Sequence, residues 1–141
     1  MRLLILPLLI LLSSCATTPI PTSEARPVPS DRLLAPQYFT RHESGDIEVI
    51  VKRDQGLSGS GNAIILYLNG QPVANLASGE IVRLYLPPGR YLLGVLPSLN
   101  FLGAHSLQET EAVIAPGAPS TFRIHTGSGD DMAFHISPTS Q

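Results

Sequence analysis

The feature that most constrains this chain is a series of short apolar runs, alternating with period two and separated by turn residues. In the first of them, residues 47–52, Ile, Val and Val alternate with Glu, Ile and Lys. Successive side chains of a strand point to opposite faces of a sheet, so this period predicts a strand with one buried face. Beyond residue 46 the sequence carries neither a sustained helical period nor the strand–helix–strand rhythm of a parallel sheet. The pattern therefore predicts an all-β fold.

Turn residues indicate where these strands reverse. Asn69-Gly70 predicts a type I′ hairpin, because both central positions of that turn need positive φ. Pro72, early in the returning run, predicts an edge strand, and the apolar run 63–68 predicts a central strand buried on both faces. The predicted strands are 47–52, 63–68, 71–76, 81–86, 90–96, 107–114, 120–125 and 132–136. About 7–8 short strands in about 100 residues predict an antiparallel β-sandwich or a small barrel.

The first fifteen residues have a different character. Met1-Arg2 is a minimal positive start, and the apolar run 3–12 is too short to span a bilayer of roughly 30 Å as a helix but fits a secretory signal. Leu12-Ser13-Ser14-Cys15 follows. These four residues resemble the bacterial lipobox, in which an aliphatic residue and two small residues precede the cysteine that receives diacylglycerol. An ordinary secretory signal with a chance cysteine is the alternative.

The lipobox resemblance implies that residues 1–14 are removed and that Cys15 carries three acyl chains, of the palmitate kind. Several chains attach a protein to a membrane effectively permanently. Ala16, rather than aspartate, follows the cysteine, which by resemblance to enterobacterial sorting favours the outer membrane. We therefore expect a lipoprotein of the bacterial cell envelope that faces the periplasm, with no cofactor besides the covalent lipid on Cys15.

Proline dominates the segment after the cysteine. Five prolines fall between residues 16 and 36, and proline removes amide donors and fixes φ, which disfavours helices and central strands. The composition predicts an extended spacer of at most about 60 Å, with a short helical turn over 30–34 that Ser30 caps and Pro36 ends. The predicted division is a signal peptide at 1–14, a lipidated N-terminus and tether at 15–44, and a β-sandwich domain at 45–141.

Part of the predicted domain resembles a known family. Residues 66–74 read Leu-Tyr-Leu-Asn-Gly-Gln-Pro-Val-Ala, and residues 84–91 read Leu-Tyr-Leu-Pro-Pro-Gly-Arg-Tyr. This pair of hairpins resembles the PEGA-type pattern, and it is similar to a proteobacterial family of small lipoproteins of unknown function that share the module. The likeness covers about residues 62–96, in one copy. It implies a β-sandwich of Ig-like, prealbumin-like or PEGA-like type in the bacterial envelope, and it implies no catalytic residues.

Composition argues against several classes of function. The single cysteine, Cys15, rules out an intramolecular disulfide and the clustered-thiolate zinc or iron–sulfur sites that need three or four cysteines. The net charge is −2 and no basic patch or helix-turn-helix pattern is visible, so nucleic acid is not an expected partner. The four histidines show no metal-binding spacing such as His-x-x-x-His, and no metal is expected.

Few side chains are candidates for acid–base chemistry. His125 and His135 fall on neighbouring predicted strands, with two aspartates in the connection between them. They either form an acid–base or metal pair or lie as partly exposed strand residues, and we favour the second interpretation. Glu109 and Glu111 share one face of a strand, and their alternation with Thr and Ala predicts a solvated face rather than a catalytic pair of carboxylates.

An apolar loop is the least ordinary feature of the domain. Loop 97–104 carries Leu99, Phe101 and Leu102, where polar residues are usual. These side chains either contact a protein or lipid partner or fold back as a lid over one end of the core, and we favour the second interpretation. We expect a non-enzymatic binding or structural module, attached to a membrane by its lipid anchor and acting on an envelope protein or polysaccharide. A small periplasmic hydrolase that uses His125 and His135, and a small-ligand carrier with an apolar cavity, are the alternatives.

Overall fold

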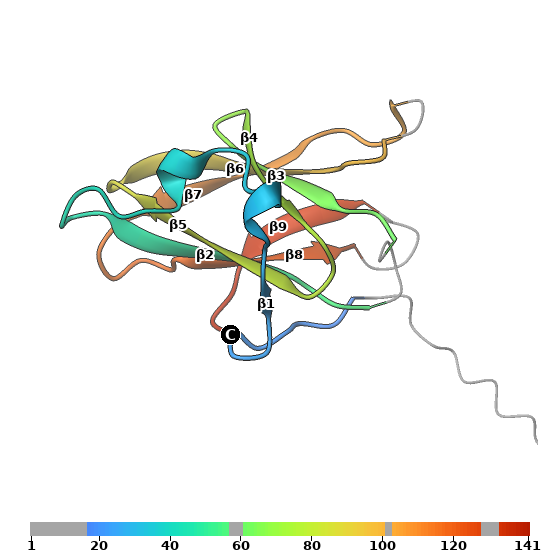
Figure 1. Ribbon diagram of the computed structural model, residues 1–141, viewed down its shortest axis with the longest axis horizontal. Coiled ribbons are helices and arrows are strands. Elements are labelled where there is room, and N and C mark those ends of the chain that lie inside the picture. The colour runs from blue at the N-terminus through green and yellow to red at the C-terminus, as the bar shows by residue number, and fades with distance from the viewer. Residues whose placement is uncertain (1–16, 57–60, 101–102, 128–132) are drawn as a thin grey trace, which may run out of the picture.

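Two β-sheets packed face to face form the molecule (Figure 1). The computed structural model describes residues 17–56, 61–100, 103–127 and 133–141. One sheet has the strand order β1-β5-β2-β8-β9 and the other has the order β4-β3-β6-β7. The strands are β1 Arg26–Pro27, β2 Ile47–Arg53, β3 Ile64–Leu68, β4 Gln71–Leu76, β5 Glu80–Leu86, β6 Gly89–Pro97, β7 Gln108–Ile114, β8 Thr121–Thr126 and β9 Phe134–Pro138. The prediction of an all-β sandwich is confirmed.

Strand direction departs from the antiparallel prediction in one of the two sheets. All eight predicted strands are present, but β1 pairs with β5 in parallel, and β2 pairs with β8 in parallel. The remaining pairings are antiparallel. A parallel pair needs a long crossover connection, and strands β3 to β7 provide it between β2 and β8. Local sequence cannot show this, because it does not say which distant strands become neighbours.

The core lies between the two sheets and follows the period-two pattern. Val49 and Val51 of β2 are fully buried, as are Leu66 of β3 and Leu93 of β6. Burying one such side chain stabilises the fold by about 1.5–3 kcal/mol. The opposite face of β3 is only half-buried, so the prediction that residues 63–68 are buried on both faces was wrong. The strand is central in its sheet, but none of the described segments forms a third layer over the outer face of that sheet.

The hairpin between β3 and β4 has the predicted geometry. Asn69 and Gly70 have φ values of 49° and 77°, both in the left-handed region that a type I′ turn needs. β4, which contains Pro72, is an edge strand as expected. An irregularity in the β3–β4 register places one extra residue in β4, next to this proline, and β-bulges are common at sheet edges.

The proline-rich segment is packed on the sandwich and is not a free spacer. The amides of Arg26 and Val28 donate to the carbonyls of Gly79 and Ile81, each at 3.0 Å, which adds β1 to the edge of β5. Farther along, the Leu34 amide donates to a β4 carbonyl at 2.8 Å. Proline is compatible with this path because only alternate amides of an edge strand face its neighbour. We call residues 17–39 the N-terminal strap.

The strap crosses from one sheet to the other along one side of the sandwich, blue to cyan in Figure 1. It contributes Ile20, Val28 and Ala35 to the buried apolar residues. The turn predicted over 30–34 is present as the 3-10 helix η1, Ser30–Arg32, although Ser30 makes no side-chain cap. Pro36 does not end this turn; it begins a second 3-10 helix, η2, Pro36–Tyr38. The prediction of an extended tether is therefore corrected for residues 17–39.

Several predictions concern residues that the structure does not describe. The signal peptide, the lipobox residues Leu12, Ser13, Ser14 and Cys15, and the loop residues Phe101 and Leu102 lie outside the described ranges. Helices long and apolar enough to cross a bilayer do not occur in the part of the chain that the structure does describe.

Candidate functional site

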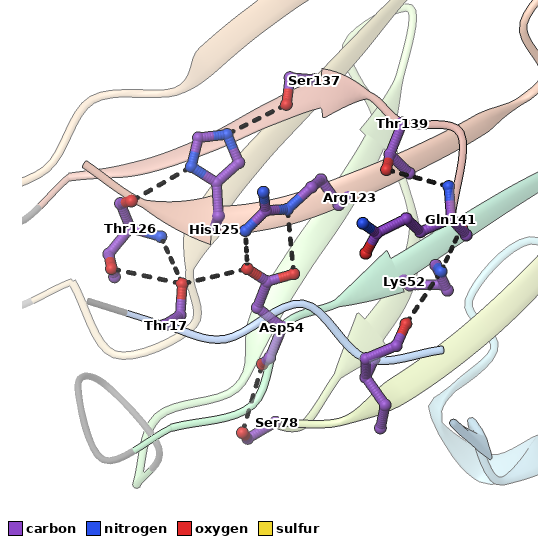
Figure 2. A network of polar contacts seen from close by, with 11 residues as sticks. Thr17, Lys52, Asp54, Ser78, Arg123, His125, Thr126, Ser137, Thr139 and Gln141 are labelled. Carbon is purple, nitrogen blue, oxygen red and sulfur yellow. Dashed lines mark hydrogen bonds and ion pairs between the residues drawn. The ribbon is translucent and has the colours of Figure 1, made fainter. Parts of the chain in front are cut away.

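A network of polar contacts surrounds Asp54, which follows the last residue of β2 (Figure 2). The Asp54 side chain is buried, and its two carboxylate oxygens accept a forked pair of hydrogen bonds from the Arg123 guanidinium. Thr17 adds a third contact, its hydroxyl donating to the carboxylate at 3.3 Å. An ion pair of this kind is strong in a partly buried setting, and here it links β2, β8 and the strap.

The first residues of the strap are fixed at the same place. Thr18 and Gln55 form an antiparallel bridge with amide-to-carbonyl distances of 2.7 and 3.0 Å. The Thr126 amide, at the end of β8, donates to the Thr17 hydroxyl at 3.2 Å. The chain is therefore held to the sandwich within two residues of Cys15.

Lys52 and Arg53 are buried beside Asp54. The Lys52 ammonium donates to the Ile20 carbonyl at 2.9 Å and to the Gln141 carbonyl, so it joins both terminal segments to β2. Desolvation by burial lowers the pKa of this lysine. The alternation of residues 47–52 predicted only that Lys52 lies on the polar face of its strand. It could not predict burial, because the segments that cover Lys52 are distant in the sequence.

Arg53 points into the core, at one end of the space between the sheets. One guanidinium nitrogen donates to the carbonyls of Asn62 and Leu76 at 2.7 and 2.8 Å, and the group lies 5.2 Å from the Phe134 ring centroid. Burial lowers its pKa to about 10, so the side chain remains charged at neutral pH. These contacts make Arg53 a structural cation at that end of the core.

The two strand histidines do come together. His125 and His135 are opposite each other on β8 and β9, with ring centroids 6.0 Å apart. The His125 ring nitrogens lie 3.1 Å from the Thr126 carbonyl and 3.1 Å from the Ser137 hydroxyl (Figure 2). Over the described residues, no group of three or more His, Cys, Asp or Glu side chains could hold a metal ion. Both rings are partly exposed, as the favoured interpretation expected.

The candidate carboxylate pair of β7 lies on a solvated face. Glu109 and Glu111 are both exposed, and Glu111 forms an ion pair of 2.6 Å with the exposed Arg90 of β6. The prediction of a solvated face is confirmed for both residues. Carboxylates in water have no buried environment that would separate their pKa values for catalysis.

Two asparagines hold the backbone of the apolar loop. The Asn62 side chain donates to the Leu99 carbonyl at 3.1 Å and accepts from the Leu99 amide at 3.0 Å. Asn100 makes the corresponding pair of contacts with the backbone of His105, each at 2.8 Å. Leu99 is 57% exposed, so this one of the three predicted contact residues does not fold back over the core.

Two pockets formed by the described residues bear on the small-ligand carrier alternative. A pocket of about 100 Å³ beside the apolar loop is lined in part by Val95, His105 and Phe134. Sites for small molecules usually occupy about 300–1,000 Å³. A larger depression of about 520 Å³, lined by residues 117–121 and 138–140, is open to solvent.

No protein-family model, curated protein or solved structure matches the chain. The resemblance to the PEGA-type pattern and to a family of small lipoproteins therefore stays a prediction. Function must be argued from the fold and from the chemistry of the residues described above.

Proposed function

We propose that this chain is a lipoprotein of the bacterial cell envelope whose β-sandwich is a binding or structural module, not an enzyme. The observation that carries the proposal is the lipobox-like sequence Leu12-Ser13-Ser14-Cys15, which ends two residues before Thr17. Thr17 is the first residue that the sandwich holds. A signal, a cysteine to be acylated and a folded domain thus follow one another in the order that a lipoprotein needs.

The use of the charged side chains supports a non-catalytic role. Asp54 is engaged by Arg123, and Glu80 is engaged by Arg32 of the strap in a two-pronged pair of 2.9 and 2.5 Å. Lys52 binds backbone carbonyls of both terminal segments. A catalytic acid or base needs to reach a substrate in a cleft, whereas these groups are committed to joining segments of the fold.

Hydrolysis is the second candidate function, favoured by the approach of His125 and His135 to 6.0 Å. In such a mechanism one imidazole would act as general base toward a water molecule. The test is hydrolysis of a panel of ester and amide substrates by the purified protein and by its His125→Gln variant. Activity that the variant loses would establish an enzyme and overturn the proposal of a non-catalytic module.

The lipidation proposal is tested by Cys15→Ala in the native host. The variant should leave the membrane fraction or accumulate as an unprocessed precursor, since no thiol remains to receive diacylglycerol. Ser13→Ala is the matched control, because it keeps a small residue in the lipobox and should be processed normally. Intact mass spectrometry of the native protein should show Cys15 as the acylated first residue. A mature protein without acyl groups would refute the proposal.

The proposed outer-membrane location depends on Ala16. By resemblance to enterobacterial sorting, Ala16→Asp should move the acylated protein to the inner membrane without changing its mass beyond the substitution. Separation of the two membranes on a density gradient measures the shift. An unchanged distribution would remove Ala16 as the sorting residue.

A further inference from the structure

We infer that the acylated protein lies directly on the lipid surface, with the end of the sandwich that carries Thr17 and Leu99 facing the bilayer and Leu99 in contact with lipid. This inference rests on the lipidation proposed above. It goes beyond lipidation because an anchor alone leaves the height and orientation of the domain undefined.

The first step is the shortness of the connection to the lipid. Cys15 and Thr17 are two residues apart, and two extended residues span at most about 7 Å. Thr17 and Thr18 are held by Asp54, Gln55 and Thr126. The reach of about 60 Å expected for a free proline-rich spacer is therefore absent while these contacts persist.

The second step identifies which end of the sandwich lies next to the lipid anchor. The strap begins beside Gln55, just beyond the last residue of β2. The neighbouring carbonyl of Asn62 accepts from Arg53, and the Asn62 side chain contacts the backbone of Leu99. These hydrogen bonds connect the anchor point to the apolar loop, so the two lie at one end of the sandwich.

The third step is the chemistry of that end. The described residues 55–56, 61–63, 97–100 and 103–107 contain no Asp, Glu, Lys or Arg. The charges at this end include the Asp54–Arg123 ion pair, and the sequence of the connection that follows β8 contains Asp130 and Asp131. Leu99 projects with 57% of its surface exposed, on a backbone that Asn62 holds. An exposed apolar side chain on a loop without charged residues is suited to the boundary between headgroups and acyl chains, close to the acylated cysteine. The chain as a whole is acidic, with a net charge of −2, so an apolar contact with neutral lipids fits better than attraction to an anionic surface.

The opposite end of the sandwich provides an internal reference. Residues 43–46 precede β2, whose first residue pairs with the last residue of β5. The seven residues of β2 separate this loop from Gln55 by roughly 23 Å at about 3.3 Å per residue. Ser44 in this loop is exposed. If the Thr17 end faces the membrane, Ser44 points away from it.

The experiment compares depth labels at the two ends of the full-length acylated protein. In that protein the thiol of Cys15 is used by the lipid, so Leu99→Cys and Ser44→Cys each supply a single thiol for a fluorophore. The proteins are reconstituted in neutral phosphatidylcholine–phosphatidylethanolamine vesicles that contain a lipid-attached quencher. We expect quenching at position 99 to exceed quenching at position 44 at least threefold, independently of salt. Equal quenching, or stronger quenching at position 44, overturns the inference.

A linker variant separates this inference from the proposed function. Insertion of twenty Gly and Ser residues between Ala16 and Thr17 should leave flotation with the vesicles unchanged and should bring the two quenching values closer together. Failure of the native protein to float with vesicles would count against lipidation itself. Normal flotation with equal quenching at both positions would count only against the docked orientation. Unchanged melting temperatures would show that the labelled proteins remain folded.

Discussion

Three consecutive charged residues of this protein are buried and join distant segments of the chain. Lys52, Arg53 and Asp54 are consecutive and buried, and each contacts a segment distant in the sequence. Burying a charge is costly unless hydrogen bonds and an opposite charge compensate for it. Asp54 has both in Arg123, whereas Lys52 and Arg53 donate hydrogen bonds to backbone carbonyls, so each of the three joins β2 to a specific neighbour.

The ion pair between Arg32 and Glu80 should be important for stability. The Glu80 side chain is 5% exposed and the Arg32 side chain 28% exposed, so Arg32→Ala leaves a buried carboxylate without its cation. We expect the free energy of unfolding to fall by about 2–3 kcal/mol, measured by urea denaturation. Arg90→Ala is the matched control, because it removes an exposed ion pair with Glu111 and should change stability by less than about 1 kcal/mol. Equal losses for the two variants would contradict the structural role of Arg32.

Asp46 should make stability depend on pH in the acid range. The backbone amides of Glu43 and His42 donate to its carboxylate at 3.0 Å and hold its pKa below the ordinary value of 3.8. A carboxyl with a lowered folded-state pKa stabilises the protein fully above its unfolded pKa, and that stability is lost as the pH falls through the folded value. Asp46→Asn should therefore be less stable than the native protein at pH 6, with the difference shrinking toward pH 2. Urea denaturation between pH 6 and pH 2 measures this difference. For Ser44→Ala, in the same loop, the difference in stability from the native protein should not change with pH.

At the scale of elements, the strap closes one open side of the sandwich. Edge strands expose unpaired amides and carbonyls, which invite pairing with other chains. β1 covers the edge of β5, and the bridge between Leu33 and Ala74 covers part of β4. Prolines within the strap suit an edge position because they provide no outward donor for a further strand. Its prolines therefore serve as edge protection as well as fixing an extended backbone.

Leu34→Pro tests the contribution of one strap hydrogen bond. The Leu34 amide donates to the Val73 carbonyl, while its side chain is 48% exposed. Proline at this position removes the donor, and we expect a loss of about 1–2 kcal/mol in stability. Leu34→Ala keeps the amide and should cost less than about 0.5 kcal/mol. Thermal and urea unfolding measure the stability of both variants. Equal stabilities of Leu34→Pro and Leu34→Ala would show that the hydrogen bond from Leu34 to Val73 contributes nothing.

At the scale of the whole molecule, the folded unit begins earlier than the predicted boundary at residue 45. Removal of residues 1–16 should leave a protein that unfolds cooperatively, because the strap remains. Removal of residues 1–44 deletes buried Ile20, Val28 and Ala35 and exposes the edges of β4 and β5. We expect the shorter protein to aggregate or to lose several kcal/mol of stability, at about 25 cal/mol per Å² of lost apolar burial. Equal melting temperatures for the two proteins would show that the strap is dispensable.

The sequence predicted several residues of the candidate site, but it did not predict most of the contacts between them. The register of β8 and β9 brings His125 and His135 together as the strand pattern suggested. Leu99 is exposed, contrary to the favoured expectation that the apolar loop folds back over the core. The network around Asp54 was not predicted, since its members come from residues 17, 54, 123 and 126. Nothing local marks Thr17 as a partner of Asp54, because that contact exists only after three distant segments meet.

The sequence by itself determined the class of fold and the positions of the strands, because side-chain period and turn chemistry act within a few residues. Only the tertiary structure decided the parallel pairing of β2 with β8 and the docking of the strap. The extended backbone that proline imposes is the same in a free spacer and in an edge strand. What separates the two is whether a distant edge, here Gly79 and Ile81 of the β5 region, accepts its hydrogen bonds.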